Sequence, residues 1–371
     1  MHSGSTLYSS SSLTGLFSKF TLKRHAYLGA FLLVLLSSCT ASSEEAQNNQ
    51  SVPQKAGLRL RQAINIYERP NGKQIASLGV SENLQLTGQV SSELYFRRKG
   101  KDTLLEPFLE ALLPDSTRCW FYADPSSFAL GMDEKEWQWS NRLKAILSPD
   151  QFRDYQQVLN NWEAPQAGVQ MLLMFQVVRV LRNQLEKSLR AYPSLPLHQV
   201  TDVLPGHQAY IEDRKTKWWL DYNVWSERAA DWPNAAAEQA LFQFYQKEVF
   251  PPDGIEYTFP AWHFPVSTTQ SHSLFGRGQH FRHLQSLDSL QQVHPFVATE
   301  WNEIRAFLLE DLTDIQTTYW ESWEAVDVEL NQILSASWRS ISTSTLAEIR
   351  LHQERLRQQA LVGNQFNYRS R

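Results

Sequence analysis

The sequence has little cysteine and no strong excess of charge of either sign. Two cysteines in 371 residues exclude a scaffold held by several disulfides and a zinc site of four thiolates. The chain carries 39 acidic and 35 basic side chains, a formal net charge of −4. Because nucleic-acid-binding proteins usually present a basic face, we expect no nucleic-acid partner.

The usual sequence motifs of catalysis are also missing. The sequence contains no phosphate-binding glycine loop, no Gly-x-Ser-x-Gly and no papain-like cysteine with a paired histidine. We therefore expect neither catalysis nor a cofactor. The hydrophobic content of 42% is that of a globular chain, and the length favours about two domains.

The first forty residues have the three parts of a secretory signal. Residues 1–25 hold basic residues but no acidic ones, residues 26–36 are uncharged and apolar, and Leu36-Ser37-Ser38-Cys39 follows. The apolar run is too short to span a bilayer comfortably. The last four residues resemble a bacterial lipobox. That resemblance implies cleavage before Cys39 and attachment of the Cys39 sulfur to acyl chains; an ordinary signal with an incidental cysteine is the alternative.

The expected address is the cell envelope. In lipoproteins of double-membraned bacteria, a residue other than Asp after the cysteine, here Thr40, implies the outer membrane. We expect a signal peptide over 1–38 and a flexible tether over 39–56, because the tether is polar and lacks apolar periodicity. The membrane is thus one expected partner, reached through the N-terminal lipid.

Residues 57–131 are strand-like. Apolar residues alternate at Leu58, Leu60, Ile64 and Ile66, and a Pro-Asn-Gly turn follows at 70–72. The segments INIYERPNGKQIASLG and EPFLEALLPD resemble the two halves of a bacterial SH3-like (SH3b) domain, with Phe108 in place of the usual Trp. The resemblance implies a small β-barrel that binds peptides or cell-wall material, or separates other domains.

Three aromatic residues of this region are candidate ligand-binding residues: Tyr67, Trp120 and Tyr122. The competing interpretation is that they pack inside the barrel or against the next domain, since Trp and Tyr are mostly buried in folded proteins.

Residues 133–371 have helical periodicity and resemble no family. Ser148-Pro149-Asp150-Gln151 is typical of a helix start, and Thr345 to Glu348 predicts another. Apolar stripes predict helices over 166–191 and Phe296 to Leu334. Such helices bury their stripes on each other, so the predicted fold is α+β and multidomain: a small SH3-like β-barrel followed by an all-α, bundle-like domain.

The segment 250–278 is rich in aromatic residues but has little periodicity, and long irregular loops are often functional. Trp262 and Phe264 are candidates for stacking on sugar rings or holding a peptide; tight packing over the bundle is the alternative.

Histidines and carboxylates add few candidates in the helical region. His280 and His283 lie one helical turn apart, with His263, His272 and His294 nearby in the sequence. No His-Glu-x-x-His occurs, and no Cys or fixed acidic partner joins the pair, so we expect no metal site. The carboxylates of Glu310, Asp311 and Asp314 are expected on solvated helix faces.

Three functions remain open. We expect a lipid-anchored cell-envelope protein that acts as a non-catalytic binding or scaffolding module, with peptidoglycan, another glycan or an envelope protein as partner. The alternative is a cell-wall or glycan hydrolase whose site lies around 250–300. A structural spacer without a ligand is the third.

Overall fold

The computed structural model describes residues 57–80, 82–131, 133–165, 170–192, 203–212, 215–267, 269–360 and 365–368. The predicted signal peptide, the tether and Cys39 lie outside the described residues. From Gly57 onward the chain belongs to one compact unit.

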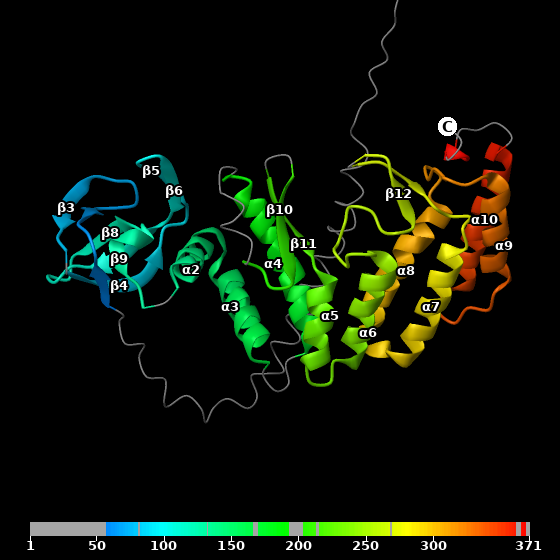
Figure 1. The fold of residues 1–371 in the computed structure, drawn as a ribbon, viewed down its shortest axis with the longest axis horizontal. Coiled ribbons are helices and arrows are strands. Elements are labelled where there is room, and N and C mark those ends of the chain that lie inside the picture. Colours follow the sequence, from blue (N-terminus) through cyan, green and yellow to red (C-terminus); the bar gives the residue numbers. More distant parts are fainter. Residues whose placement is uncertain are drawn as a thin grey trace, which may run out of the picture. The chain divides into compact units, whose positions relative to one another are not determined.

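The first part of this unit is an antiparallel sheet (Figure 1). Its strands pair in the order β3-β2-β8-β7-β4-β1-β9. Their bounds are β1 (Gly57–Leu60), β2 (Ile64–Tyr67), β3 (Gln74–Leu78), β4 (Asn83–Val90), β7 (Phe108–Leu112), β8 (Arg118–Tyr122) and β9 (Phe128–Ala129). A separate hairpin joins β5 (Tyr95–Lys99) to β6 (Asp102–Glu106).

The alternation of apolar residues in the sequence matches the burial of side chains in the first strands. Leu58, Leu60, Ile64 and Ile66 are buried, and Asn65 between the two isoleucines is exposed. Successive side chains of a strand point to opposite faces, so one face of the sheet becomes the core. The pairings among the described strands run from β3 to β9 and form no closed barrel.

Helices follow the sheet, which confirms the α+β class. They are α2 (Glu134–Ile146), α3 (Pro149–Glu163), α4 (Met171–Leu189), α5 (Tyr222–Asp231), α6 (Ala236–Phe244), α7 (Gln279–Val293), α8 (Ala298–Thr313), α9 (Trp323–Ser335) and α10 (Thr343–Ala360). A π-helical turn, η4 (Tyr245–Val249), extends α6, and short 3₁₀ turns η2 (Pro125–Ser127) and η5 (Pro295–Val297) precede β9 and α8.

The helical region is not all-α, because two hairpins interrupt it. One pairs β10 (His207–Glu212) with β11 (Lys215–Leu220), and the other pairs β12 (His263–Pro265) with β13 (Ser271–Ser273). The second hairpin lies within residues 250–278, the segment predicted to be an irregular loop because it has little periodicity.

Helix capping explains where several boundaries fall. Ser148 begins α3 with both bonds of a capping box, as predicted. The predicted helix from Phe296 to Leu334 is wrong: α8 ends at Thr313, and Ser322 caps α9 by accepting from the Ala325 N–H. Ser342, not Thr345, caps the last helix, since its hydroxyl accepts from the Thr345 N–H.

The β region and the helices share side chains at their junction. Trp137 of α2 is buried in the core of the sheet, whereas Leu94 and Leu105 of the β region belong to the helical core. At the same junction a buried ion pair joins Glu106 of β6 to Arg142 of α2, with Oε1 to Nη2 at 2.6 Å. The first helix therefore belongs to both cores.

None of the helices in the described ranges is both long enough and apolar enough to cross a bilayer.

Candidate functional site

The β12–β13 hairpin has one polar face and one aromatic face. Phe264 of β12 lies opposite His272 of β13, and the pairs on either side are His263 with Ser273 and Pro265 with Ser271. Since side chains alternate along a strand, His263, Ser271 and Ser273 share one face while Phe264 and His272 share the other.

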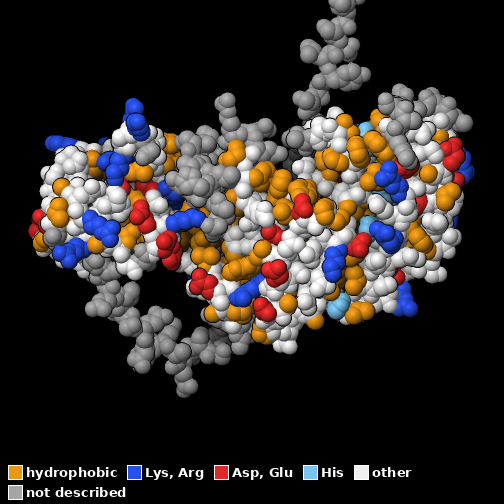
Figure 2. All heavy atoms as spheres, viewed as in Figure 1, with side chains coloured by type: hydrophobic (Ala, Val, Ile, Leu, Met, Phe, Trp, Pro, Cys, Tyr) orange, Lys and Arg blue, Asp and Glu red, His pale blue; other side chains and the backbone are white. Residues whose placement is uncertain are grey.

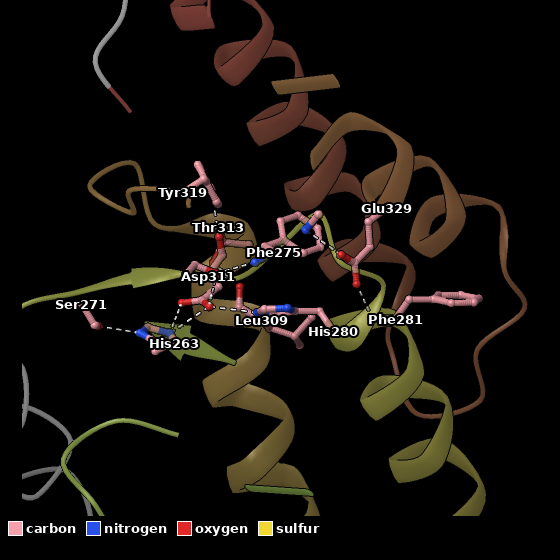
Figure 3. A network of polar contacts seen from close by, with 12 residues as sticks. His263, Ser271, Phe275, His280, Phe281, Leu309, Asp311, Thr313, Tyr319 and Glu329 are labelled. Carbon is pink, nitrogen blue, oxygen red and sulfur yellow. Dashed lines mark hydrogen bonds and ion pairs between the residues drawn. The ribbon is translucent and has the colours of Figure 1, made fainter. Parts of the chain in front are cut away.

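The polar face converges on one buried carboxylate, that of Asp311 in α8 (Figure 3). Its Oδ2 accepts from the Ser273 hydroxyl at 2.7 Å and lies 2.9 Å from Nε2 of both His263 and His280. His263 also contacts Oδ1 at 3.0 Å. Asp311 is only 5% exposed, which corrects the expectation that it would lie on a solvated helix face.

The partners of Asp311 keep it ionised. Burial alone would raise the pKa of its carboxyl group, but the charge of His263 and the hydrogen bonds from His263 and His280 outweigh burial and hold the pKa well below its usual range. An ionised carboxylate only accepts hydrogen bonds, so Nε2 of both histidines carries a proton.

Ser271 completes a linear array with His263 and Asp311. Its hydroxyl oxygen lies 2.7 Å from Nδ1 of His263, whose Nε2 faces Asp311. When the His263 ring is charged, Nδ1 donates to the Ser271 oxygen; when the ring is neutral, Nδ1 is the acceptor and the Ser271 hydroxyl donates to it. Ser271 is half-buried, and the His263 side chain is 19% exposed.

Backbone bonds fix the hairpin to the segment that separates α8 from α9. The Ser273 N–H donates to the Thr318 carbonyl at 2.8 Å, and the Trp320 N–H donates to the Ser273 carbonyl at 2.9 Å. The Tyr319 hydroxyl donates to the backbone carbonyl of Asp311 at 3.0 Å. This is the physical reason for the break in the predicted long helix, because residues 318–320 serve as a partner for β13.

A second carboxylate holds the chain that leads from the hairpin into α7. Glu329 of α9 is buried and accepts from the backbone N–H groups of Gly276, Gly278 and Phe281 at 2.7 to 2.9 Å. Both glycines have positive φ, and a Cβ on Gly276 would meet the α9 backbone at 3.1 Å. A carboxylate at the start of a helix is also favoured by the helix dipole.

The outer side of the hairpin carries four aromatic rings, which we call the aromatic face: Phe264, His272, Trp320 and Tyr368. Phe264 lies 4.0 Å from Trp320 between ring centroids, and His272 stacks on Tyr368 at 3.8 Å. Phe264 is 42% exposed. Figure 2 shows hydrophobic side chains gathered at the surface where Figure 1 places β12.

The structure separates the two aromatic candidates of this segment. Phe264 belongs to the aromatic face, whereas Trp262 is fully buried and packs against His283, with ring centroids 5.6 Å apart. Trp262 is part of the core, so a ligand at the surface does not reach it.

The three candidates of the β region lie on neighbouring strands. Tyr67 and Trp120 are cross-strand partners and half-buried. Tyr122 is buried, donates its hydroxyl to the Tyr95 carbonyl at 2.9 Å and accepts from the Glu106 N–H. Tyr122 thus holds the β5–β6 hairpin against the sheet.

His280 and His283 turn to different partners although they share a helix turn. His280 contacts Asp311, while Nδ1 of His283 lies 3.3 Å from Glu248. The pKa of His283 is lowered to about 4, mainly by burial. Within the described ranges no group of three or more His, Cys, Asp or Glu side chains is arranged to hold a metal ion.

Sequence reasoning missed Ser271, Ser273, Asp311, Trp320 and Glu329. One local pattern could have indicated Ser271 and Ser273. In Ser-His-Ser over 271–273 two small polar residues alternate with a histidine, as on the two faces of a strand. Asp311 and Glu329 act on residues 31 to 53 positions away, and no local pattern marks such a contact.

The chain matches no protein-family model, no curated protein and no solved structure. The features that bear on its function are therefore the two faces of the hairpin.

Proposed function

We propose that this chain is a lipid-anchored cell-envelope protein that binds a glycan of the envelope on its aromatic face, without catalysis. The observation that carries the proposal is the group of rings formed by Phe264, His272, Trp320 and Tyr368. Half-exposed aromatic rings offer flat apolar surface of the kind that stacks on sugar rings, and exposed apolar patches mark interaction sites.

The rings of the aromatic face lie on a hairpin that other bonds hold in place. The opposite side of the same hairpin is bonded to Asp311, and its backbone is bonded to residues 318–320. A surface whose rings are already held in place loses less conformational entropy when a ligand binds. The buried network thus has a plain role as the support of a binding surface.

The lipid anchor and the SH3-like domain complete the proposal. Attachment at Cys39 follows from the lipobox resemblance and would keep the binding surface beside a membrane, close to the cell wall. The antiparallel strands, with the turn at 70–72 between β2 and β3, support an SH3-like relationship for residues 57–131.

Binding to purified peptidoglycan tests the proposal. We expect Phe264→Ala and Trp320→Ala each to weaken co-sedimentation of the full chain with peptidoglycan about tenfold, the effect of losing roughly one aromatic contact. Phe296→Ala is the matched control, because Phe296 is 52% exposed but lies on η5 and is not one of the rings of the aromatic face. Equal binding by Trp320→Ala and wild type would refute the proposal and favour a spacer.

The anchor has its own test. Mass spectrometry of the native N-terminal peptide should find residues 1–38 removed and Cys39 acylated, and a Cys39→Ala chain should leave the membrane fraction. An unmodified Cys39 in an uncut chain would remove the envelope location, whatever the binding result.

One observation favours hydrolysis as a second function. In the Ser271–His263–Asp311 array, His263 is placed to take the Ser271 proton while Asp311 orients the ring. These are the roles of the partners of an activated serine, with the two ring nitrogens exchanged: here Nδ1 faces the serine and Nε2 faces the carboxylate. Such an array acts on esters and amides, whereas most enzymes that cleave glycosidic bonds use a pair of carboxylates. The alternative function therefore narrows to cleavage of an ester or amide bond in the cell wall.

A fluorophosphonate probe, which reacts with activated serines, distinguishes the two functions. A hydrolase would be labelled at Ser271, and Ser271→Ala would lose the label while Ser267→Ala kept it. If the wild-type chain stays unlabelled and still binds peptidoglycan, the array is only the support of the aromatic face.

A further inference from the structure

Three aromatic rings of the β region surround the guanidinium group of Arg97. Its Cζ lies 4.9 Å from the ring centroid of Tyr67, 5.1 Å from that of Phe108 and 4.7 Å from that of Tyr122. All three distances are within the range in which a cation is attracted to the face of a ring. One cation with three rings is the composition of an aromatic cage.

The cage is built by separate strands of the sheet. Tyr67 lies on β2, Phe108 on β7 and Tyr122 on β8. The plane of Phe108 is inclined by 90° to that of Tyr67 and by 72° to that of Tyr122. Because the planes are steep to one another, the rings enclose a common volume and do not form a flat stack.

The rings are fixed, whereas the cation is delivered by a small hairpin. Phe108 is fully buried, and the Tyr122 hydroxyl is bonded on both sides. Arg97 projects from β5, which pairs only with β6 among the described strands (Figure 1). The three rings thus form a preformed cation site, and the guanidinium group of Arg97 occupies it.

The Arg97 charge has no acidic partner in the described part of the chain. The ion pairs of the neighbouring residues involve Lys99 with Asp124 and Arg142 with Glu106, and none involves Arg97. A guanidinium held only by ring faces is easier to exchange for another cation than one held by a carboxylate, because no buried negative charge is left behind.

We propose that this cage is a binding site for the cationic side chain of a peptide, with arginine as the best fit, and that Arg97 occupies it in the free chain. The incoming guanidinium takes the place of Arg97 on the same three rings. This site lies in the β region and does not depend on the aromatic face of the β12–β13 hairpin. Competition by Arg97 makes the apparent affinity of the wild-type chain low.

Arginine and citrulline provide matched probes, because they share a shape and differ in charge. NMR titration of the full chain with acetyl-Gly-Arg-Gly-amide should show at least tenfold tighter binding to Arg97→Ala than to wild type. The citrulline tripeptide should bind Arg97→Ala at least tenfold more weakly than the arginine tripeptide. Arg98→Ala is the control for charge removal, since Arg98 is exposed and follows Arg97 in β5, so its side chain points to the opposite face; it should behave as wild type.

A second substitution tests the cage itself. Tyr67→Ala in the Arg97→Ala background should abolish the gain in arginine binding. If Arg97→Ala does not fold, Arg97→Gln keeps the length of the side chain without its charge and replaces it in the same titration. Binding by these Arg97 variants that equals wild type, or that does not distinguish arginine from citrulline, overturns the proposal and leaves the rings as a structural support of the hairpin.

Discussion

Two buried carboxylates join distant segments of this molecule, and they respond to burial in opposite ways. Glu106 of the β region pairs with Arg142 and accepts from Gln138, and burial still raises its pKa to about 7. Asp311 of the helical region is held by His263, His280 and Ser273, and its pKa is lowered. Both side chains are almost inaccessible to water.

The difference shows that burial alone does not decide the charge of a carboxylate. The larger effect on Glu106 is desolvation, which Arg142 and Gln138 offset only in part. Around Asp311 the charge of His263 and the hydrogen bonds from both histidines exceed the cost of desolvation. The number and kind of hydrogen-bond donors that face the two carboxylate oxygens decide whether desolvation or these interactions have the larger effect on the pKa.

Removing the Asp311 carboxylate should have the largest effect. Asp311→Ala leaves His263, His280 and Ser273 without their common acceptor, and we expect a loss of about 4 kcal/mol in the free energy of unfolding. Chemical denaturation measures it. Glu310→Ala, the half-buried neighbour on the same helix, is the control; similar small losses in both variants would mean that the network does not hold the hairpin.

The pH dependence of stability should differ between the two carboxylates. A raised folded-state pKa means that the folded chain binds the Glu106 proton more tightly than the unfolded chain does. The contribution of Glu106 to stability is therefore fully present below about pH 4.5 and falls by up to about 3 kcal/mol as the pH rises to 7. Glu106→Gln should remove this slope, while Asp311→Asn should keep it. A slope that persists in Glu106→Gln contradicts the assignment.

Removing one donor from Asp311 tests whether donors set its pKa. Ser273→Ala should cost about 1.5 kcal/mol, the value of a hydrogen bond to a charged group. Because a lowered carboxyl pKa stabilises the fold above the ordinary carboxyl pKa, that stability is lost on acidification. Without the Ser273 donor the loss should begin at higher pH than in wild type. Acid unfolding followed by circular dichroism measures the shift, and an unchanged acid transition would count against the role of Ser273.

The smallest expected effect is at Gln138. Gln138→Leu removes one neutral donor from Glu106 and should cost about 1 kcal/mol at neutral pH. The pKa of Glu106 should rise further, so the decline of stability with pH should extend to higher pH. Thermal unfolding across pH 5 to 9 checks this. If Gln138→Leu lost more free energy of unfolding than Ser273→Ala, the donor to Glu106 would matter more than the donor to Asp311, contrary to this prediction.

Local patterns predicted the elements whose residues carry their own signal. The alternation from Leu58 to Ile66 predicted buried strand faces, and Ser148 with Gln151 predicted the start of α3. Both depend on residues within a few positions of each other, where spacing determines which groups meet.

The patterns failed where distant partners decide the structure. The apolar stripe from Phe296 to Leu334 continues through the break at residues 314–322, because α8 and α9 bury their stripes in the same core. The three-residue strand β12 ends in Pro265 and is too short to show a period. Nothing near Asp311 indicates that His263, 48 positions earlier, will be its partner.

The sequence by itself determined the alternation of the first strands, the α+β class and the cap of α3, because each depends on contacts between near neighbours. Only the tertiary structure decided that Asp311 is buried, that Phe264 is exposed while Trp262 is not, and that Arg97 lies among three rings. Those outcomes depend on which distant segments pack together, since the charge, exposure and partners of a side chain are set by whatever surrounds it.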